Sequence, residues 1–250
     1  MGPHEDPRGF GAQPRLSTVP MHIIYLHGFA SSPDSTKARF LQQRLEECGV
    51  TLYCPDLNEP DFSTLTVSRM VGQVERLVGG LTPGPVALIG SSLGAFVAVH
   101  AAERAWRLRH HAGARADADH PIERLVLLAP ALDFGANRMT HLGPDGLERW
   151  RSTNRLVVDH YAEGRVRHVH YGLYEDAQQY DSFAAVARVP TLVLQGRRDD
   201  LVDPAMVERF ALGRAHVTLV PLDDGHQLAA SLDRVWRETS AFLQLSPLPA

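Results

Sequence analysis

Six short apolar runs recur along the chain, separated by longer segments in which polar and apolar residues mix. The runs are rich in β-branched and aromatic residues, as expected of strands that are covered on both faces. We therefore predict strands over residues 22–26, 51–54, 86–89, 122–129, 191–195 and 217–222.

Several segments between these runs carry apolar residues at the three- and four-residue spacing of amphipathic helices. Asp34 or Ser35 is predicted to cap the first of these helices, and Gly49 to end it. Because strands that alternate with helices favour parallel order and right-handed crossovers, the sequence indicates the α/β class. We expect a mostly parallel sheet with helices on both faces. The predicted helices cover residues 38–48, 67–78, 95–102 and 232–243.

Two segments depart from this alternation. Residues 107–120 are rich in Arg, His, Ala and Asp and are predicted to form a solvated loop. Roughly sixty residues separate the strand ending at Ala129 from the one beginning at Thr191, far more than a simple crossover needs. This stretch carries a helical pattern over residues 145–153 and then a hairpin pattern, with strands over 156–161 and 165–171.

The long connection predicts a cap insertion over residues 133–188. Four tyrosines of this insertion either line a pocket for an acyl group or pack the cap against the body, and the sequence favours neither role. They are Tyr161, Tyr171, Tyr174 and Tyr180.

The chain of 250 residues is 44% hydrophobic, which is enough to bury one sizeable α/β core. We expect a single domain over residues 21–250. Residues 1–20 carry Pro, Gly and charge without apolar periodicity and are predicted to be a disordered tail.

Charge and cysteine content narrow the class of protein further. The net charge of −4 gives no electrostatic footprint for nucleic acid or an anionic membrane. The histidines are scattered, and His168 and His170 are interpreted as solvent-facing residues rather than metal ligands. Two cysteines, Cys48 and Cys54, form no disulfide framework and favour a reducing cytosol. We therefore expect a cytoplasmic protein without a metal site or a membrane span.

The segment from Val86 to Ala105 carries the strongest signal for chemistry. A buried strand leads into the turn Gly90-Ser91-Ser92-Leu93-Gly94, and a helical pattern follows. This is the context of a nucleophile elbow, in which the central serine projects above the sheet edge. The glycines allow strand and helix to approach closely, since they lack Cβ atoms. Ser92 is therefore the candidate nucleophile.

A serine hydroxyl needs a general base, and the base needs a third group that fixes its tautomer. His226 follows the last predicted strand, and Asp199 follows the strand before it. The order Ser, Asp, His is that of α/β-hydrolases, and each residue follows the carboxyl end of a strand. Asp200 is the rival acid, because it is the next residue along the chain.

The oxyanion of acyl transfer needs backbone N–H donors. Leu93, directly after the nucleophile, supplies one candidate. The loop after the first strand supplies the other, and Phe29 is the expected donor. His27 in the same loop is interpreted as a structural histidine.

Residues 25–33 (YLHGFASSP) and 90–94 (GSSLG) resemble the small YqiA-like esterases of the serine α/β-hydrolase superfamily, and the resemblance covers most of residues 21–245. It implies an α/β-hydrolase fold and an enzyme without a cofactor that prefers short acyl chains. It also implies a triad of Ser92, Asp199 and His226, with Phe29 and Leu93 at the oxyanion hole. The insertion and the N-terminal tail depart from those compact enzymes.

The sequence thus predicts a serine hydrolase that cleaves a small-molecule carboxylic ester through an acyl-enzyme on Ser92. A thioesterase is the nearest alternative, since the same acyl-enzyme forms from several leaving groups. A catalytically silent ligand-binding protein of the same fold is the alternative from another class.

Overall fold

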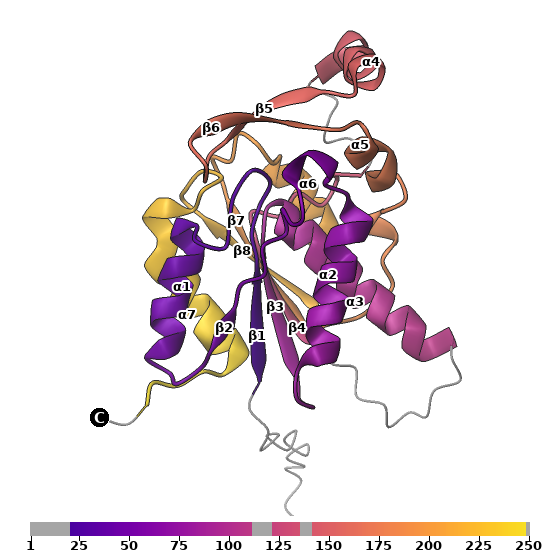
Figure 1. Ribbon diagram of the computed structural model, residues 1–250. Coiled ribbons are helices and arrows are strands. Elements are labelled where there is room, and N and C mark those ends of the chain that lie inside the picture. The colour runs from indigo at the N-terminus through magenta and orange to yellow at the C-terminus, as the bar shows by residue number, and fades with distance from the viewer. Residues whose placement is uncertain (1–20, 112–121, 136–141, 249–250) are drawn as a thin grey trace, which may run out of the picture.

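The computed structural model describes residues 21–111, 122–135 and 142–248 (Figure 1). The expected tail over residues 1–20 lies outside them. Six strands form one sheet in the order β2-β1-β3-β4-β7-β8, and each neighbouring pair is parallel. The expected parallel α/β sheet is confirmed. The strands are β1 (His22–Leu26), β2 (Leu52–Tyr53), β3 (Val86–Ser91), β4 (Ile122–Leu128), β7 (Thr191–Gly196) and β8 (Val217–Leu222).

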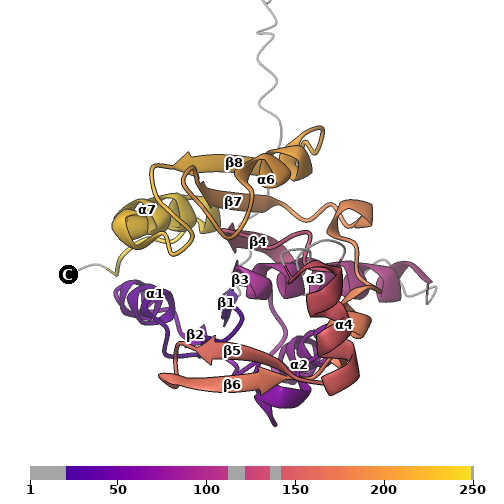
Figure 2. The same cartoon turned by 90° about the horizontal axis from the view of Figure 1, so that it is seen from above.

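Helices cover both faces of the sheet (Figure 2). Alternate residues of the strands pack into opposite buried clusters. In β1, Ile23 and Tyr25 belong to one buried cluster, and Ile24 and Leu26 belong to the other. Because both faces are buried, the strands read as continuous apolar runs. On the Ile23 face lie α1 (Thr36–Glu46) and α7 (Leu232–Leu243), and on the Ile24 face lie α2 (Val67–Gly80), α3 (Leu93–His111) and α6 (Pro204–Ala211).

The ends of α1 follow from two residues. The Ser35 hydroxyl accepts a hydrogen bond from the Ala38 backbone N–H at 3.3 Å, so Ser35 rather than Asp34 is the N-cap. Gly49, shortly after the helix, has a φ of 68°, a left-handed conformation that glycine adopts without steric cost.

Helices α3 and α6 and strand β2 differ from the sequence prediction. Helix α3 continues to His111, so the prediction of a loop is wrong for residues 107–111, which are helical. The rest of the predicted loop, residues 112–120, lies outside the described residues. Helix α6 was not predicted; Asp203 caps it and Pro204 occupies its first turn. Strand β2 is two residues long, shorter than the predicted 51–54.

The long connection between β4 and β7 contains a helix and a hairpin where the sequence predicts them. Strands β5 and β6 pair antiparallel, and Figure 1 shows them above the carboxyl ends of the sheet strands. Helix α5 was not predicted. The elements of the connection are α4 (Gly143–Thr153), β5 (Leu156–His160), β6 (Arg165–Val169), α5 (Gly172–Ala177) and the 3₁₀-helix η3 (Ser182–Ala184). Elsewhere, 3₁₀-helices occur at η1 (Phe62–Thr64) and η4 (Ala229–Ser231).

Candidate active site

Ser92 lies at the junction of β3 and α3 in a left-handed backbone conformation, with a φ of 53°. The junction is tight. A Cβ on Gly90 would lie 2.5 Å from the Gly94 carbonyl oxygen, and a Cβ on Gly94 would overlap the carbonyl oxygen of Leu26. Glycine is therefore required at both positions, and the turn lifts the Ser92 side chain above the end of β3.

Hydrogen bonds to the end of β4 hold the Ser92 backbone. Its N–H donates to the Leu128 carbonyl oxygen at 2.9 Å, and its carbonyl oxygen accepts from the Ala131 N–H at 3.2 Å. These contacts hold the strained turn in place.

His226 lies in the loop after β8, and its Nε2 is 3.1 Å from the Ser92 Oγ. Its Nδ1 is 2.9 Å and 3.1 Å from the two carboxylate oxygens of Asp199. Since a carboxylate only accepts, Nδ1 carries the proton, and Nε2 is free to accept the serine proton.

Asp199 is fully buried at its side chain and is held by several donors. Besides His226, it accepts from the Leu201 N–H at 2.9 Å, the Val202 N–H at 2.8 Å and the Gln195 Nε2 at 3.0 Å. Burial alone would raise the pKa of Asp199, but the bonds from His226, Val202 and Gln195 outweigh it and hold the pKa below its ordinary value. The carboxylate is therefore ionised beside the imidazole at neutral pH.

Asp200, the alternative acid of the sequence analysis, has an exposed side chain. The structure thus brings Ser92, His226 and Asp199 into one hydrogen-bonded row.

The expected oxyanion donors lie beside Ser92. Leu93 is the first residue of α3, so its N–H has no acceptor within the helix. A Cβ on Gly28 would be 3.4 Å from the Ser92 Cβ, so the loop that carries Phe29 lies directly against the serine. Phe29 and Leu93 both line the cavity above Ser92.

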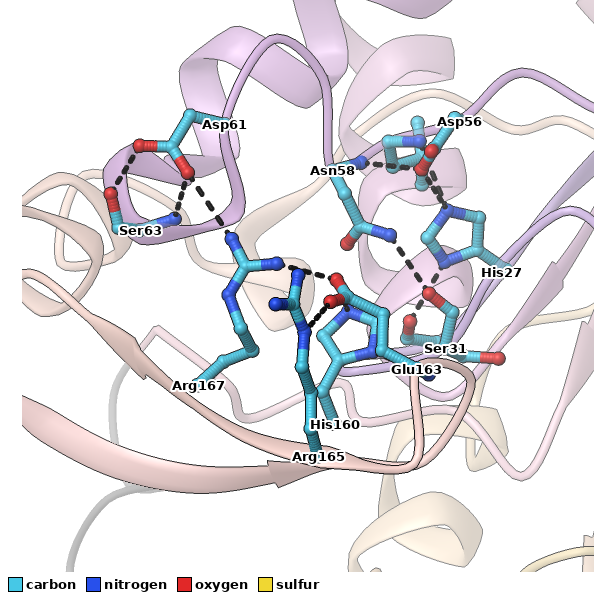
Figure 3. Close-up of polar contacts among 12 residues, drawn as sticks. His27, Ser31, Asp56, Asn58, Asp61, Ser63, His160, Glu163, Arg165 and Arg167 are labelled. Carbon is cyan, nitrogen blue, oxygen red and sulfur yellow. Dashed lines mark hydrogen bonds and ion pairs between the residues drawn. The ribbon is translucent and has the colours of Figure 1, made fainter.

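Two residues brace this loop against the connection between β2 and α2 (Figure 3). The His27 ring is buried; its Nδ1 lies 2.9 Å from the Gly28 carbonyl oxygen, and its Nε2 accepts from the Leu57 N–H at 3.0 Å. The Asn58 amide donates to the Ser31 carbonyl oxygen at 2.8 Å. His27 therefore has the structural contacts that the sequence indicates, and Asn58 is a brace that sequence reasoning missed.

Lys37 is a second residue that sequence reasoning missed. Its side chain is buried in the first turn of α1, and its Nζ donates to the carbonyl and the side-chain oxygen of Gln227, the residue after His226. Burial lowers the pKa of Lys37 to about 8, although the negative charges of Asp199 and Asp224 act to raise it. A sequence signal was available: Lys37 is the only lysine in the chain, and it stands four residues before Leu41 on the apolar stripe of its helix.

A cavity of about 1110 Å³ opens above the Ser92 hydroxyl. One part of its wall comes from the β1–α1 connection, another from the segment after β4, and a third from strand β5. The site is therefore enclosed jointly by loops of the sheet and by the hairpin.

The four tyrosines of the insertion differ in their surroundings. Tyr161 lines the cavity. Tyr171 and Tyr174 pack against Trp150, with ring centroids 5.5 Å and 6.2 Å away. Tyr180 packs against His100 with ring centroids 5.0 Å apart. Tyr180 thus packs the insertion against the body, as one of the two expected roles requires, whereas Tyr171 and Tyr174 pack within the insertion and Tyr161 borders the cavity.

The histidine pair and the cysteines take no part in this site. The rings of His168 and His170 lie 5.8 Å apart. Within the residues that the structure describes, no group of three or more His, Cys, Asp or Glu side chains could hold a metal ion. Cys48 and Cys54 are free thiols. Among the described helices, none combines the length and apolar character needed to cross a membrane.

Several solved structures share this fold at low sequence identity. A putative hydrolase from Agrobacterium vitis S4 is 22% identical, with a TM-score of 0.75, over 89% of this chain and 87% of its own. Est1E from Butyrivibrio proteoclasticus, with ferulic acid bound, is 20% identical, with a TM-score of 0.72, over 90% and 88%. Mouse alpha/beta hydrolase domain-containing protein 10 is 18% identical, with a TM-score of 0.70, over 91% of each chain.

Curated protein sequences give no match to this chain. The sequence profile of the uncharacterised protein family UPF0227 matches residues 22–244, which is nearly the whole described region. The chain therefore belongs to family UPF0227, and its fold is that of the α/β-hydrolase superfamily.

Proposed function

We propose that this protein is a serine hydrolase that cleaves carboxylic esters through an acyl-enzyme on Ser92. The observation that carries the proposal is the row of contacts from the Ser92 Oγ through both ring nitrogens of His226 to the buried Asp199. A hydroxyl, an imidazole and a carboxylate in this order can activate an alcohol toward an acyl carbon.

In the first half of the proposed reaction, the Ser92 Oγ attacks the ester carbonyl carbon while its proton moves to the His226 Nε2. The carbonyl π electrons move to the oxygen, giving a tetrahedral intermediate. This intermediate collapses: the bond from carbon to the leaving oxygen breaks, and the leaving oxygen takes the proton from His226. Asp199 stabilises the transient imidazolium and keeps its Nδ1–H oriented.

In the second half, water attacks the acyl carbon and gives a proton to His226. The bond between the acyl carbon and the Ser92 Oγ then breaks, the serine recovers its proton, and the carboxylic acid leaves. In both halves the backbone N–H groups of Phe29 and Leu93 are the proposed donors to the oxyanion. Loss of one such donor typically lowers kcat about 100- to 1,000-fold.

Two further observations support ester chemistry. The ferulic acid in Est1E is a carboxylic acid, the class of product that ester hydrolysis releases. The resemblance to small esterases favours short acyl groups, so a short p-nitrophenyl ester is a suitable first substrate. No proposed step requires a cofactor or a metal ion.

The test combines turnover with covalent labelling. The wild-type protein is expected to hydrolyse p-nitrophenyl butyrate and to react with a fluorophosphonate probe at Ser92. Ser92→Ala is expected to lose both properties while it remains folded. Ser91→Ala, at the last residue of β3, is the matched control and is expected to keep the label.

Retained turnover in folded Ser92→Ala would contradict the assignment. A folded wild-type protein that neither reacts with the probe nor turns over the ester would favour the silent binding protein instead. Faster turnover of matched thioesters than of oxygen esters would identify the protein as a thioesterase that uses the same acyl-enzyme.

A further inference from the structure

Strand β5 lines the cavity with two apolar side chains. Leu156 and Val158 line it above Ser92, and the exposed Asp159 lines it near the end of the strand. Val157 lies between the two apolar residues, is absent from the lining and is 63% exposed, as the two-residue period of a strand predicts. Leu156 and Val158 therefore form an apolar wall of the site, and Asp159 lies beyond this wall toward the hairpin turn.

The apolar wall continues toward the nucleophile. Phe134 and Ala131, after β4, line the same cavity, as do Phe29 and Leu93 beside Ser92. Another part of the cavity lining is polar: Ser31, Ser32 and Asp34 line it from the β1–α1 connection, and Thr36 and Arg39 line it from the start of α1. A substrate with an apolar acyl group and a more polar leaving group matches these two parts of the lining.

Contacts with the body and with helix α4 of the insertion hold the wall in position. The ring of His160, at the end of β5, packs edge-on against Phe62 of η1, with centroids 4.7 Å apart. Arg167 of β6 lies between Asp61 and Glu163, and its guanidinium is 3.4 Å from the Asp61 carboxylate (Figure 3). At the other end of the hairpin, the Trp150 Nε1 donates to the Val169 carbonyl oxygen at 2.9 Å.

The size of the site exceeds what a short acyl ester needs. Pockets for drug-sized ligands span about 300–1,000 Å³, and this cavity measures about 1110 Å³. An acetyl or butyryl group on Ser92 would leave most of the apolar wall uncovered. A longer acyl chain would cover the apolar wall and would itself be removed from contact with water.

We propose that Leu156 and Val158 determine acyl-chain specificity and that the preferred substrates are esters of medium-length linear acyl groups, which lie along these two residues and are longer than the resemblance to small esterases implies. This inference rests on the proposed function, because it places the acyl carbon at Ser92. Each methylene buried against the wall should raise kcat/KM about fourfold until the wall is covered.

The experiment measures kcat/KM for p-nitrophenyl esters from acetate to dodecanoate, which share one leaving group and differ only in acyl length. Wild-type activity is expected to rise from acetate to a maximum at a medium chain. Val158→Trp, which fills the cavity, is expected to move the maximum to shorter chains and to lower the medium-chain value at least tenfold relative to acetate. Val157→Trp, on the outer face of the same strand, is the matched control and is expected to keep the wild-type profile.

A smaller substitution keeps the test decisive should the Val158→Trp variant not fold. Val158→Ser removes apolar surface without adding bulk and is expected to flatten the rise of kcat/KM with acyl-chain length. A wild-type maximum at acetate, or identical profiles for Val157 and Val158 variants, would overturn the inference and leave the proposed function standing. A wild-type protein that hydrolyses no ester of the series would instead overturn the proposed function, and this inference with it.

Discussion

Ser92 holds a backbone conformation that costs a residue with a side chain about 1–3 kcal/mol, and it is not alone at this edge of the sheet. Ala30, in the loop after β1, and Ala129, directly after β4, also have positive φ values, of 53° and 46°. Strained residues of this kind persist only where their surroundings fix them, and they gather at functional sites. Here the hydrogen bonds of Ser92 to Leu128 and Ala131 hold the serine against the segment that contains Ala129.

Replacement of Asp199 by asparagine tests the role of its negative charge. The Asp199→Asn variant keeps the size of the side chain but removes the charge that is proposed to stabilise the imidazolium. The asparagine amide also favours the wrong tautomer of His226. We expect ester hydrolysis at pH 7 to fall by about four orders of magnitude. The measurement is kcat on a short p-nitrophenyl ester, with folding checked by circular dichroism.

Asp200→Asn is the control for this substitution, because the exposed carboxylate of Asp200 lies one residue away. It is expected to keep kcat within about twofold, as is usual for exposed positions away from the chemistry. Equal losses in the two variants would show that the local charge of the loop matters rather than the contact with His226.

The order of Ser92, Asp199 and His226 along the chain is sufficient to nominate them, because each follows a strand that a short apolar run predicts. The choice between Asp199 and Asp200 depends on the direction of the backbone after β7, which no local pattern encodes. The roles of Lys37 and Asn58 depend on hydrogen bonds to residues far away in the sequence, Gln227 and Ser31 respectively. Their contacts exist only in the folded chain.

At the scale of elements, the spacing of apolar residues predicted the helices and strands that bury a continuous apolar stripe. It failed for segments that bury few side chains or are mostly polar. Residues 107–111 extend α3, and their arginines and histidines are as compatible with an exposed helix as with a loop. Helix α6 is short, although its Asp203 cap and its buried Met206, Val207 and Phe210 carry a detectable signal.

The junction of β3 and α3 depends on close backbone approach, and a single methyl group tests it. In Gly94→Ala, the new Cβ would overlap the carbonyl oxygen of Leu26, which is backbone and cannot move aside cheaply. We expect a loss of about 3 kcal/mol in the free energy of unfolding, at the upper end of the effects of overpacking. Urea denaturation followed by circular dichroism measures it.

Gly79→Ala is the matched control, since Gly79 also lies within a helix and a Cβ there would meet nothing within 4 Å. Here alanine is expected to stabilise the protein by about 0.5–1 kcal/mol, because it loses less backbone freedom on folding. A Gly94→Ala variant as stable as Gly79→Ala would mean that strand and helix can separate at the elbow without cost.

At the scale of the whole molecule, Lys37 joins parts of the chain that are 190 residues apart. It connects the start of α1 to the loop between β8 and α7, and both helices lie on the same face of the sheet (Figure 2). A charge buried at this junction makes the stability of the whole fold depend on pH. The sign of that dependence follows from the direction of the pKa shift.

The folded protein holds Lys37 at a pKa of about 8, whereas an unfolded lysine has a pKa of about 10.4. Below pH 8 both states carry the proton, and the folded state bears the cost of the buried charge. Between about pH 8 and 10 only the unfolded state keeps the proton, so this contribution makes the folded state more stable as pH rises. In Lys37→Met the contribution is absent. We therefore expect the free energy of unfolding of the wild type, relative to Lys37→Met, to rise by up to about 1.4 kcal/mol per pH unit in this window.

Denaturation curves of both proteins at pH 7, 8, 9 and 10 give this difference. Arg39→Met removes an exposed cation two residues away and is the control, for which the difference from wild type should stay constant with pH. Because the chain has a single lysine, reductive methylation with ¹³C also gives the Lys37 pKa from one side-chain resonance. Parallel stability curves for the wild type and Lys37→Met, together with a resonance that titrates near pH 10.4, would show that the ammonium stays hydrated and does not bear on the stability of the fold.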